Sequence, residues 1–217
     1  MPDFTQRRVT MVDTQVRPSD VTKFPILDAM LRVPREAYVP DAKRDIAYAD
    51  TPVDLGGARQ LLDARAIAKL LEALTPAPTD LVLEIGASTG YTTALLASMA
   101  EAVVAVEEDE DLARDAEAAL AEQGVDNAAL VTGPLSDGSP KHGPFDMIMI
   151  FGGVQDVPVT LLDQLKDGGH IAAIFMDGAL GEARVGVKTG GQVSWRMVFN
   201  ATAPVLPGFE NAPSFAF

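Results

Sequence analysis

The chain has 217 residues, 47% of them hydrophobic, with a net charge of −14 and no cysteine. This length and apolar content suit one folded domain, or one domain with a small extension, and disfavour disorder. The absence of thiols excludes disulfides, thiolate metal sites and cysteine nucleophiles. The acidic charge disfavours nucleic acid as a partner, and the two histidines, His142 and His170, lack metal-ligand spacing. We therefore expect no metal and no nucleic acid.

The N-terminal residues 1–10 contain no apolar run after their charged residues, so they do not form a secretory signal. No stretch of about 18 apolar residues suggests a membrane span. We therefore expect a cytoplasmic protein with no membrane partner. Because a high net charge opposes self-association, a monomer is the simplest expectation.

The first predicted helix covers residues 19–32, where the apolar residues have helical spacing. Ser19 is a plausible N-cap for it, although Pro25 weakens its middle. The Pro- and Gly-rich segment 33–62 is predicted to be irregular. We expect residues 1–62 to form a helical and irregular extension that packs on a main domain, residues 63–217.

The main domain begins with a helix predicted over residues 63–75, with Asp63 as its cap. An alternation of strand and helix patterns follows. The strand patterns are apolar on both faces, as a parallel sheet covered by helices requires. These five strands are predicted at 80–86, 102–108, 128–133, 145–152 and 170–175, with helices at 90–99, 109–123 and 158–165.

Residues 183–199 alternate between apolar and polar positions around Gly190-Gly191, which predicts an antiparallel hairpin. With the five parallel strands, the hairpin makes seven. The predicted fold class is α/β: a doubly wound, mostly parallel, seven-stranded Rossmann-like sheet. A C-terminal antiparallel hairpin closes it and a helical extension precedes it.

A glycine-rich turn follows the first of these strands, in the sequence LEIGASTGY. Such a turn lets the backbone approach a ligand at the start of a helix. A dinucleotide fingerprint fails here because Ser88 and Tyr91 replace its second and third glycines. The turn fits an S-adenosylmethionine loop, E/D-x-G-x-G-x-G, better. The predicted cofactor-binding residues are Glu84, Gly86, Ala87, Ser88 and Gly90, with Ser88 in place of the middle glycine.

The second predicted strand ends at Glu107, twenty-one positions after Gly86. A carboxylate at that point can accept hydrogen bonds from both ribose hydroxyls of a cofactor, as in dinucleotide-binding folds. We therefore add Glu107 to the predicted cofactor site. The alternative is that Glu107 only opens the solvated acidic run 107–111.

Several segments resemble protein-L-isoaspartate O-methyltransferases in order and spacing: VPREAYVP (33–40), AYADTPVDLG (47–56), LVLEIGASTGYTTALLA (81–97) and GPFDMIMIFGGVQDVPVTLLDQLKDGGHIAAI (143–174). The resemblance implies methyl transfer from S-adenosylmethionine to the carboxylate of an isoaspartyl residue in damaged protein. That nucleophile is ionised near pH 7, so the scarcity of histidine is no obstacle. Alignment of the carboxylate with the methyl group can supply much of the rate.

The sequence departs from the family at the position of a T-I-S-x-P signature, whose serine lies at the reacting centre. Here Gln60 falls at the threonine position, Leu62 at the serine position and Ala64 at the proline position. The resemblance thus places Leu62 and Gln60 at the catalytic position, where leucine offers no hydrogen bond, so we expect weak methylation. In the alternative, Leu62 is a core residue before the Asp63 cap, and Gln60 supplies the hydrogen bond.

The family also has a Gly-Asp-Gly near the adenine, where this chain reads GPLSDG (133–138). Asp137 reaches the adenine amine only if that loop is rearranged; otherwise it is an ordinary turn acid. Two other functions stay open: a methyltransferase with a different acceptor, and a non-catalytic S-adenosylmethionine-binding or interaction protein. The failed dinucleotide fingerprint opposes a dehydrogenase.

Overall fold

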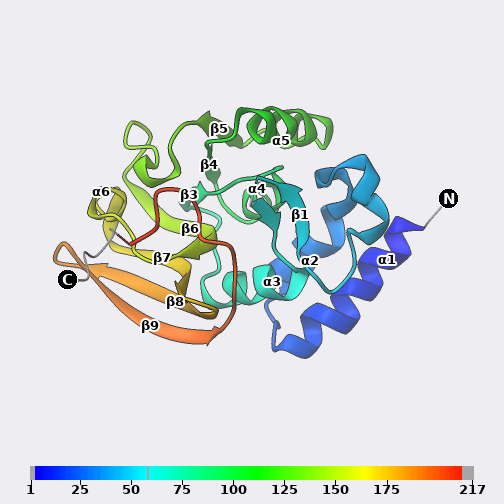
Figure 1. Ribbon diagram of the computed structural model, residues 1–217, viewed down its shortest axis with the longest axis horizontal. Helices are drawn as coiled ribbons and strands as arrows, with labels where there is room; N and C mark the ends of the chain where they lie inside the picture. Colours follow the sequence, from blue (N-terminus) through cyan, green and yellow to red (C-terminus); the bar gives the residue numbers. More distant parts are fainter. Residues whose placement is uncertain (1–2, 58, 212–217) are drawn as a thin grey trace.

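The computed structural model describes residues 3–57 and 59–211. Its centre is a seven-stranded sheet (Figure 1), made of β3 (Leu81–Ile85), β4 (Ala102–Glu107), β5 (Ala128–Thr132), β6 (Phe145–Val154), β7 (Leu165–Asp177), β8 (Leu180–Thr189) and β9 (Gln192–Asn200). The strand order is β5-β4-β3-β6-β7-β8-β9. The first five strands pair in parallel, and β8 and β9 pair antiparallel. The predicted fold class is confirmed.

The strand order reverses between β3 and β6. From β3 the chain adds β4 and then β5 on one side, and from β6 it adds β7 to β9 on the other. Open α/β sheets bind ligands at such a switch point, outside the carboxyl ends of the strands. The topology therefore selects the end of the sheet at which a site is expected.

The predicted hairpin is also present. Strands β8 and β9 are joined by Gly190 and Gly191, whose φ angles are +59° and +80°. Positive φ at both central residues matches the strand twist, and glycine adopts it without steric cost. This hairpin forms one edge of the sheet, and β5 forms the other (Figure 1).

The helices that flank the sheet are α1 (Phe4–Met11), α2 (Phe24–Arg32), α3 (Ala64–Ala73), α4 (Tyr91–Ala97), α5 (Glu110–Glu122) and the short α6 (Val159–Leu162). The cap predicted for α3 is present, because Asp63 Oδ1 accepts a hydrogen bond from Ala66 N at 2.8 Å. The N-terminal helices α1 and α2 lie beside α3, and α5 lies along the β4–β5 side (Figure 1).

The helix predicted over residues 19–32 was wrong in its first turn. Helix α2 begins at Phe24, with Pro25 in its first turn, where a missing N–H costs nothing. Ser19 does not cap it, since its hydroxyl donates to the Gln15 carbonyl at 2.8 Å. Asp20, with φ +63°, ends the preceding turn. Pro25 therefore marks the start of the helix rather than its middle.

The segment 33–62 is more ordered than predicted. It contains two 3₁₀ turns, Arg35–Tyr38 and Asp41–Ile46, and a two-stranded antiparallel sheet of β1 (Val53–Gly56) and β2 (Arg59–Leu61). This small sheet buries the paired Val53 and Leu61 against the main core. Strands this short carry too few alternating residues for a sequence pattern to reveal them.

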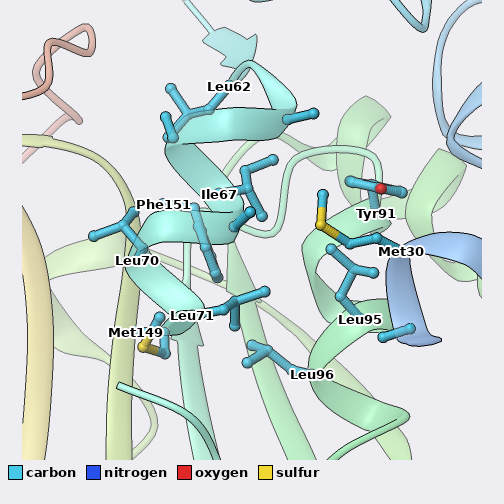
Figure 2. Close-up of a cluster of buried hydrophobic side chains, with 14 of the residues drawn as sticks. Met30, Leu62, Ile67, Leu70, Leu71, Tyr91, Leu95, Leu96, Met149 and Phe151 are labelled. Atoms are coloured by element: carbon cyan, nitrogen blue, oxygen red, sulfur yellow. The ribbon is translucent and has the colours of Figure 1, made fainter. Parts of the chain in front are cut away.

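Each face of the main sheet carries its own apolar cluster. One cluster joins alternate strand residues with α3, α4 and the N-terminal helices, and Figure 2 shows Met30 of α2 close to Leu95 of α4 and near α3. The other cluster includes Ile85, Val106 and Leu206. Because the N-terminal part shares the first core, the division at residue 62 stays a proposal. None of the helices in the described ranges is long and apolar enough to cross a membrane.

Candidate functional site

The glycine-rich turn lies at the carboxyl end of β3, next to the switch point. Gly86 and Gly90 have φ angles of +82° and +91°, which favour glycine. A Cβ atom on Gly90 would lie 3.3 Å from Ala116 Cβ of α5, so glycine also permits close packing there. A Cβ atom on Gly86 would lie 3.2 Å from Leu206 Cδ1. At both glycines, therefore, neighbouring side chains lie where a Cβ atom would point.

Ala87 and Ser88 attach this turn to the neighbouring strand β4. The backbone N–H of Ala87 donates to the Val106 carbonyl at 3.2 Å. Ser88 has a φ of +52°, unusual for a residue with a Cβ, and its N–H donates to Glu107 Oε2 at 2.7 Å. The hydrogen bond to a charged acceptor offsets the cost of that backbone conformation. Ser88 replaces glycine without losing the turn.

Glu107 is fully buried at the end of β4 and is the anionic centre of the site. Its Oε1 accepts hydrogen bonds from the N–H groups of Glu108 and Asp109, at 3.0 and 3.1 Å. Its Oε2 accepts from Ser88 N at 2.7 Å and from Arg59 Nη2 at 2.6 Å. The carboxylate is therefore held by four donors and faces the glycine turn, rather than opening a solvated run.

Arg59 is the residue of this site that sequence analysis missed. It comes from β2, and its side chain is only 6% exposed. Besides Glu107, its Nη2 contacts Ser88 Oγ at 3.3 Å and lies 3.4 Å from the position of a Cβ on Gly86. The buried Nε and Nη1 atoms have no hydrogen-bond partner among the residues that the structure describes. No pattern pointed to Arg59, because β2 itself was not predicted.

Glu84 lies behind the turn rather than on its open side. It is fully buried, and its Oε1 accepts a hydrogen bond from the Thr92 hydroxyl at the start of α4. Burial raises the pKa of Glu84 to about 7, although the Thr92 and Thr93 hydroxyls oppose the shift. Glu84 thus ties α4 to β3 and shapes the turn from within.

Asp137 follows β5, whereas the other predicted cofactor residues lie at the ends of β3 and β4. It ends a 3₁₀ turn, Leu135–Asp137, after β5, and its side chain is exposed. Its backbone carbonyl accepts a hydrogen bond from Gln164 Nε2 at 2.8 Å. The turn lies at the same end of the sheet as Glu107, so the adenine role assigned to Asp137 stays a prediction.

Leu62 lies in the apolar core at the N-terminal end of α3 (Figure 2), and it is 3% exposed. Its carbonyl accepts a hydrogen bond from Arg35 Nη2 at 2.7 Å. Gln60 is half-buried and pairs with Asp54 across the small β1–β2 sheet. The two residues therefore have different surroundings: Leu62 packs into the core, and Gln60 lies on the small β1–β2 sheet.

Arg35, from the VPRE segment, holds this region together. It is fully buried, and its Nε donates to the Ala47 carbonyl at 2.7 Å. Its guanidinium lies 5.0 Å from the ring centroid of Tyr91, the first residue of α4. Through these two bonds, Arg35 links the family-like segments 33–40 and 47–56 to Leu62 at the start of α3, where the sequence departs from the family.

A groove of about 1250 Å³ opens beside the start of α3, at the carboxyl end of the sheet. Asp63, Arg65 and Lys69 line it from α3, and Phe175 and Glu182 line it from β7 and β8. The segment after β9 borders the groove. Val205 of this segment forms a parallel bridge with Gly153 of β6. Among the described residues, no group of three His, Asp or Glu side chains is suited to hold a metal.

Comparison with known proteins identifies the family. Residues 7–192 match the model of the protein-L-isoaspartate(D-aspartate) O-methyltransferase family. A protein-L-isoaspartate O-methyltransferase of Syntrophus aciditrophicus is 38% identical over 79% of this chain and 78% of its own length. Another, of Methylorubrum extorquens, is 38% identical over 79% of this chain and 75% of its own.

Solved structures share the fold. A protein-L-isoaspartate O-methyltransferase superposes with a TM-score of 0.80 at 23% identity, covering 93% of this chain and 66% of that one. A putative Plasmodium falciparum member, in complex with S-adenosyl-L-homocysteine, also gives 0.80, at 18% identity, covering 95% and 99% of the two chains. The family match and the identities above establish that this chain belongs to the protein-L-isoaspartate(D-aspartate) O-methyltransferase family.

Proposed function

We propose that this chain transfers a methyl group from S-adenosylmethionine to the free carboxylate of isoaspartyl residues in damaged proteins. Family membership supports the activity, and one structural observation supports the cofactor. Glu107 presents a buried carboxylate beside a glycine turn at the carboxyl end of two parallel strands, next to the switch point. That is where α/β sheets hold a nucleoside ribose.

The residues present fit the cofactor. Gly86 has no side chain to block a ligand from the backbone of the turn, Gly90 lets the turn pack closely against α5, and Glu107 is an acceptor for the ribose hydroxyls. The bound cofactor would supply a sulfonium methyl group. Leu206 and Arg59 now lie against Gly86, so both side chains must turn aside when a ligand reaches the turn.

The groove beside the start of α3 suits the methyl acceptor. It lies at the same end of the sheet as the glycine turn, on the other side of the switch point. The acceptor carboxylate is ionised near pH 7, so the protein needs to orient it rather than deprotonate it. Arg65 and Lys69 are basic residues of that groove that could contact the acceptor carboxylate, among acidic neighbours such as Asp63 and Glu182.

We further propose a cytoplasmic monomer that acts on protein or peptide substrates and not on nucleic acid. The net charge of −14 supports this, because like-charged copies repel one another and phosphate backbones. Light scattering at micromolar concentration should give the mass of one chain; a stable dimer would contradict the proposal.

Calorimetry tests the cofactor directly. S-adenosylhomocysteine should bind and NAD should not, because the turn lacks two glycines of the dinucleotide fingerprint. Tight binding of NAD, or no binding of S-adenosylhomocysteine, would refute the proposed cofactor. Label transfer to a small molecule but to no isoaspartyl peptide would instead point to a different acceptor.

A further inference from the structure

The Arg59 guanidinium occupies a position in the candidate cofactor site that a ligand would share. It is buried, pairs with Glu107 at 2.6 Å and lies directly over Gly86. Any ligand that donates hydrogen bonds to Glu107 therefore displaces Arg59 Nη2 from that carboxylate. A buried guanidinium set free in this way needs a new partner, because an unpaired buried charge is costly.

Within the described residues, two of the three nitrogens of this guanidinium lack a partner. Nε carries one N–H and Nη1 carries two, and both nitrogens are buried without an acceptor. Buried donors in folded proteins are nearly always satisfied, so this group points to an acceptor that completes the site. The planar guanidinium matches a carboxylate with two parallel hydrogen bonds, which makes a carboxylate the best-fitting partner.

S-adenosylmethionine carries both groups that these two residues need. Its ribose diol donates hydrogen bonds and matches Glu107, and the α-carboxylate of its methionine end accepts them and matches Arg59. We propose that Arg59 is the cofactor-carboxylate-binding residue, and that it rests on Glu107 when the ligand is absent. This inference depends on the proposed cofactor.

The exchange explains why neither charge is left unpaired. Without ligand, Arg59 and Glu107 neutralise each other at 2.6 Å. With ligand, Glu107 keeps its three backbone N–H donors and turns its remaining acceptor capacity to the diol. Arg59 then turns its fork to the carboxylate. A competing interpretation makes Arg59 a simple plug that only blocks the site.

The test compares two ligands that differ at one end. S-adenosylhomocysteine has the amino-acid carboxylate, whereas 5′-methylthioadenosine has the same nucleoside and a thioether but no carboxylate. Binding of both is measured by calorimetry on the full chain and on Arg59→Met, Arg59→Lys and Arg114→Ala. Arg114 is the matched control, since its side chain is 68% exposed in a surface pair with Asp111.

Arg59→Met should weaken S-adenosylhomocysteine about 10- to 100-fold, the loss expected for a charged hydrogen-bonded pair. It should leave binding of methylthioadenosine unchanged or make it tighter, because that ligand displaces Arg59 from Glu107 without offering it a new partner. Arg114→Ala should change the binding of neither ligand. Arg59→Lys keeps the positive charge but loses the planar, two-pronged guanidinium. Its affinity for S-adenosylhomocysteine, and for that ligand alone, should lie between the affinities of wild type and Arg59→Met. Thermal melting checks that each variant is folded. If Arg59→Met does not fold, the comparison of the two ligands on Arg59→Lys tests the inference.

Three results would overturn the inference. Equal weakening of both ligands would make Arg59 merely structural. Tighter binding of both would make it a plug. Wild type that binds the two ligands equally well would show that the carboxylate is not recognised. Each of these leaves the proposed function standing, whereas wild type that binds neither ligand would remove the proposed cofactor and this inference together.

Discussion

Substitution of Glu107 by glutamine should strongly destabilise the fold, because it removes the counter-charge of a buried arginine. Four donors now point at the carboxylate, from Ser88, Glu108, Asp109 and Arg59. A glutamine offers one acceptor oxygen and one NH₂ group, so two of these donors would face another donor. Breaking one partner of a buried ion pair costs about 3–5 kcal/mol, and we expect Glu107→Gln to fall in that range.

A buried ion pair between Arg59 and Glu107 couples the effects of their substitutions on the free energy of unfolding. Arg59→Met should cost less than Glu107→Gln, because Glu107 keeps three backbone N–H donors when the arginine is gone. The double variant should be more stable than the sum of the single losses predicts, by at least about 1 kcal/mol. Urea unfolding followed by circular dichroism measures all four proteins. Single effects that add within about 0.5 kcal/mol would refute the ion pair as described.

Three further predictions concern Glu84, Leu62 and Arg35. Burial raises the pKa of Glu84 from 4.5 to about 7, so its stabilising contribution is complete below about pH 4.5 and is lost as the pH rises through about 7. Relative to Glu84→Gln, the wild type should therefore lose up to about 3 kcal/mol between about pH 5 and pH 8 in urea titrations, and a constant difference would contradict this. Leu62→Ser should cost about 1–3 kcal/mol and leave methyl transfer unimproved, because the side chain is core; a faster variant would show that the missing hydroxyl limits the reaction. Arg35→Lys should leave the Ala47 or Leu62 carbonyl without its hydrogen bond, which should reduce the free energy of unfolding by about 1–3 kcal/mol and lower the melting temperature. An unchanged melting temperature would show that these bonds are dispensable.

The parallel part of the sheet could be predicted from sequence because its strand patterns are apolar on both faces and are separated by helical patterns. The hairpin could be predicted because Gly190-Gly191 meets the backbone demand of a two-residue turn. The start of α2 could not, since Pro25 reads as a helix breaker or as a helix opener until the neighbouring turn is known.

The candidate site could be predicted in its backbone but not in its charge pairing. The glycine turn and Glu107 belong to local patterns at the ends of adjacent strands. Arg59 lies 48 positions from Glu107 in sequence and meets it only through tertiary packing of an unpredicted hairpin. The placement of Leu62 inside the core likewise depends on Arg35, which holds its carbonyl from 27 residues away.

Labelled methyl transfer tests the proposed function most directly. Radiolabelled S-adenosylmethionine is incubated with the protein and an isoaspartyl peptide, beside the twin peptide that has a normal aspartyl residue. We predict label on the isoaspartyl peptide alone, and loss of that label in Glu107→Ala that still folds. Equal label on both peptides, or label on neither while S-adenosylhomocysteine still binds, would contradict the proposed function.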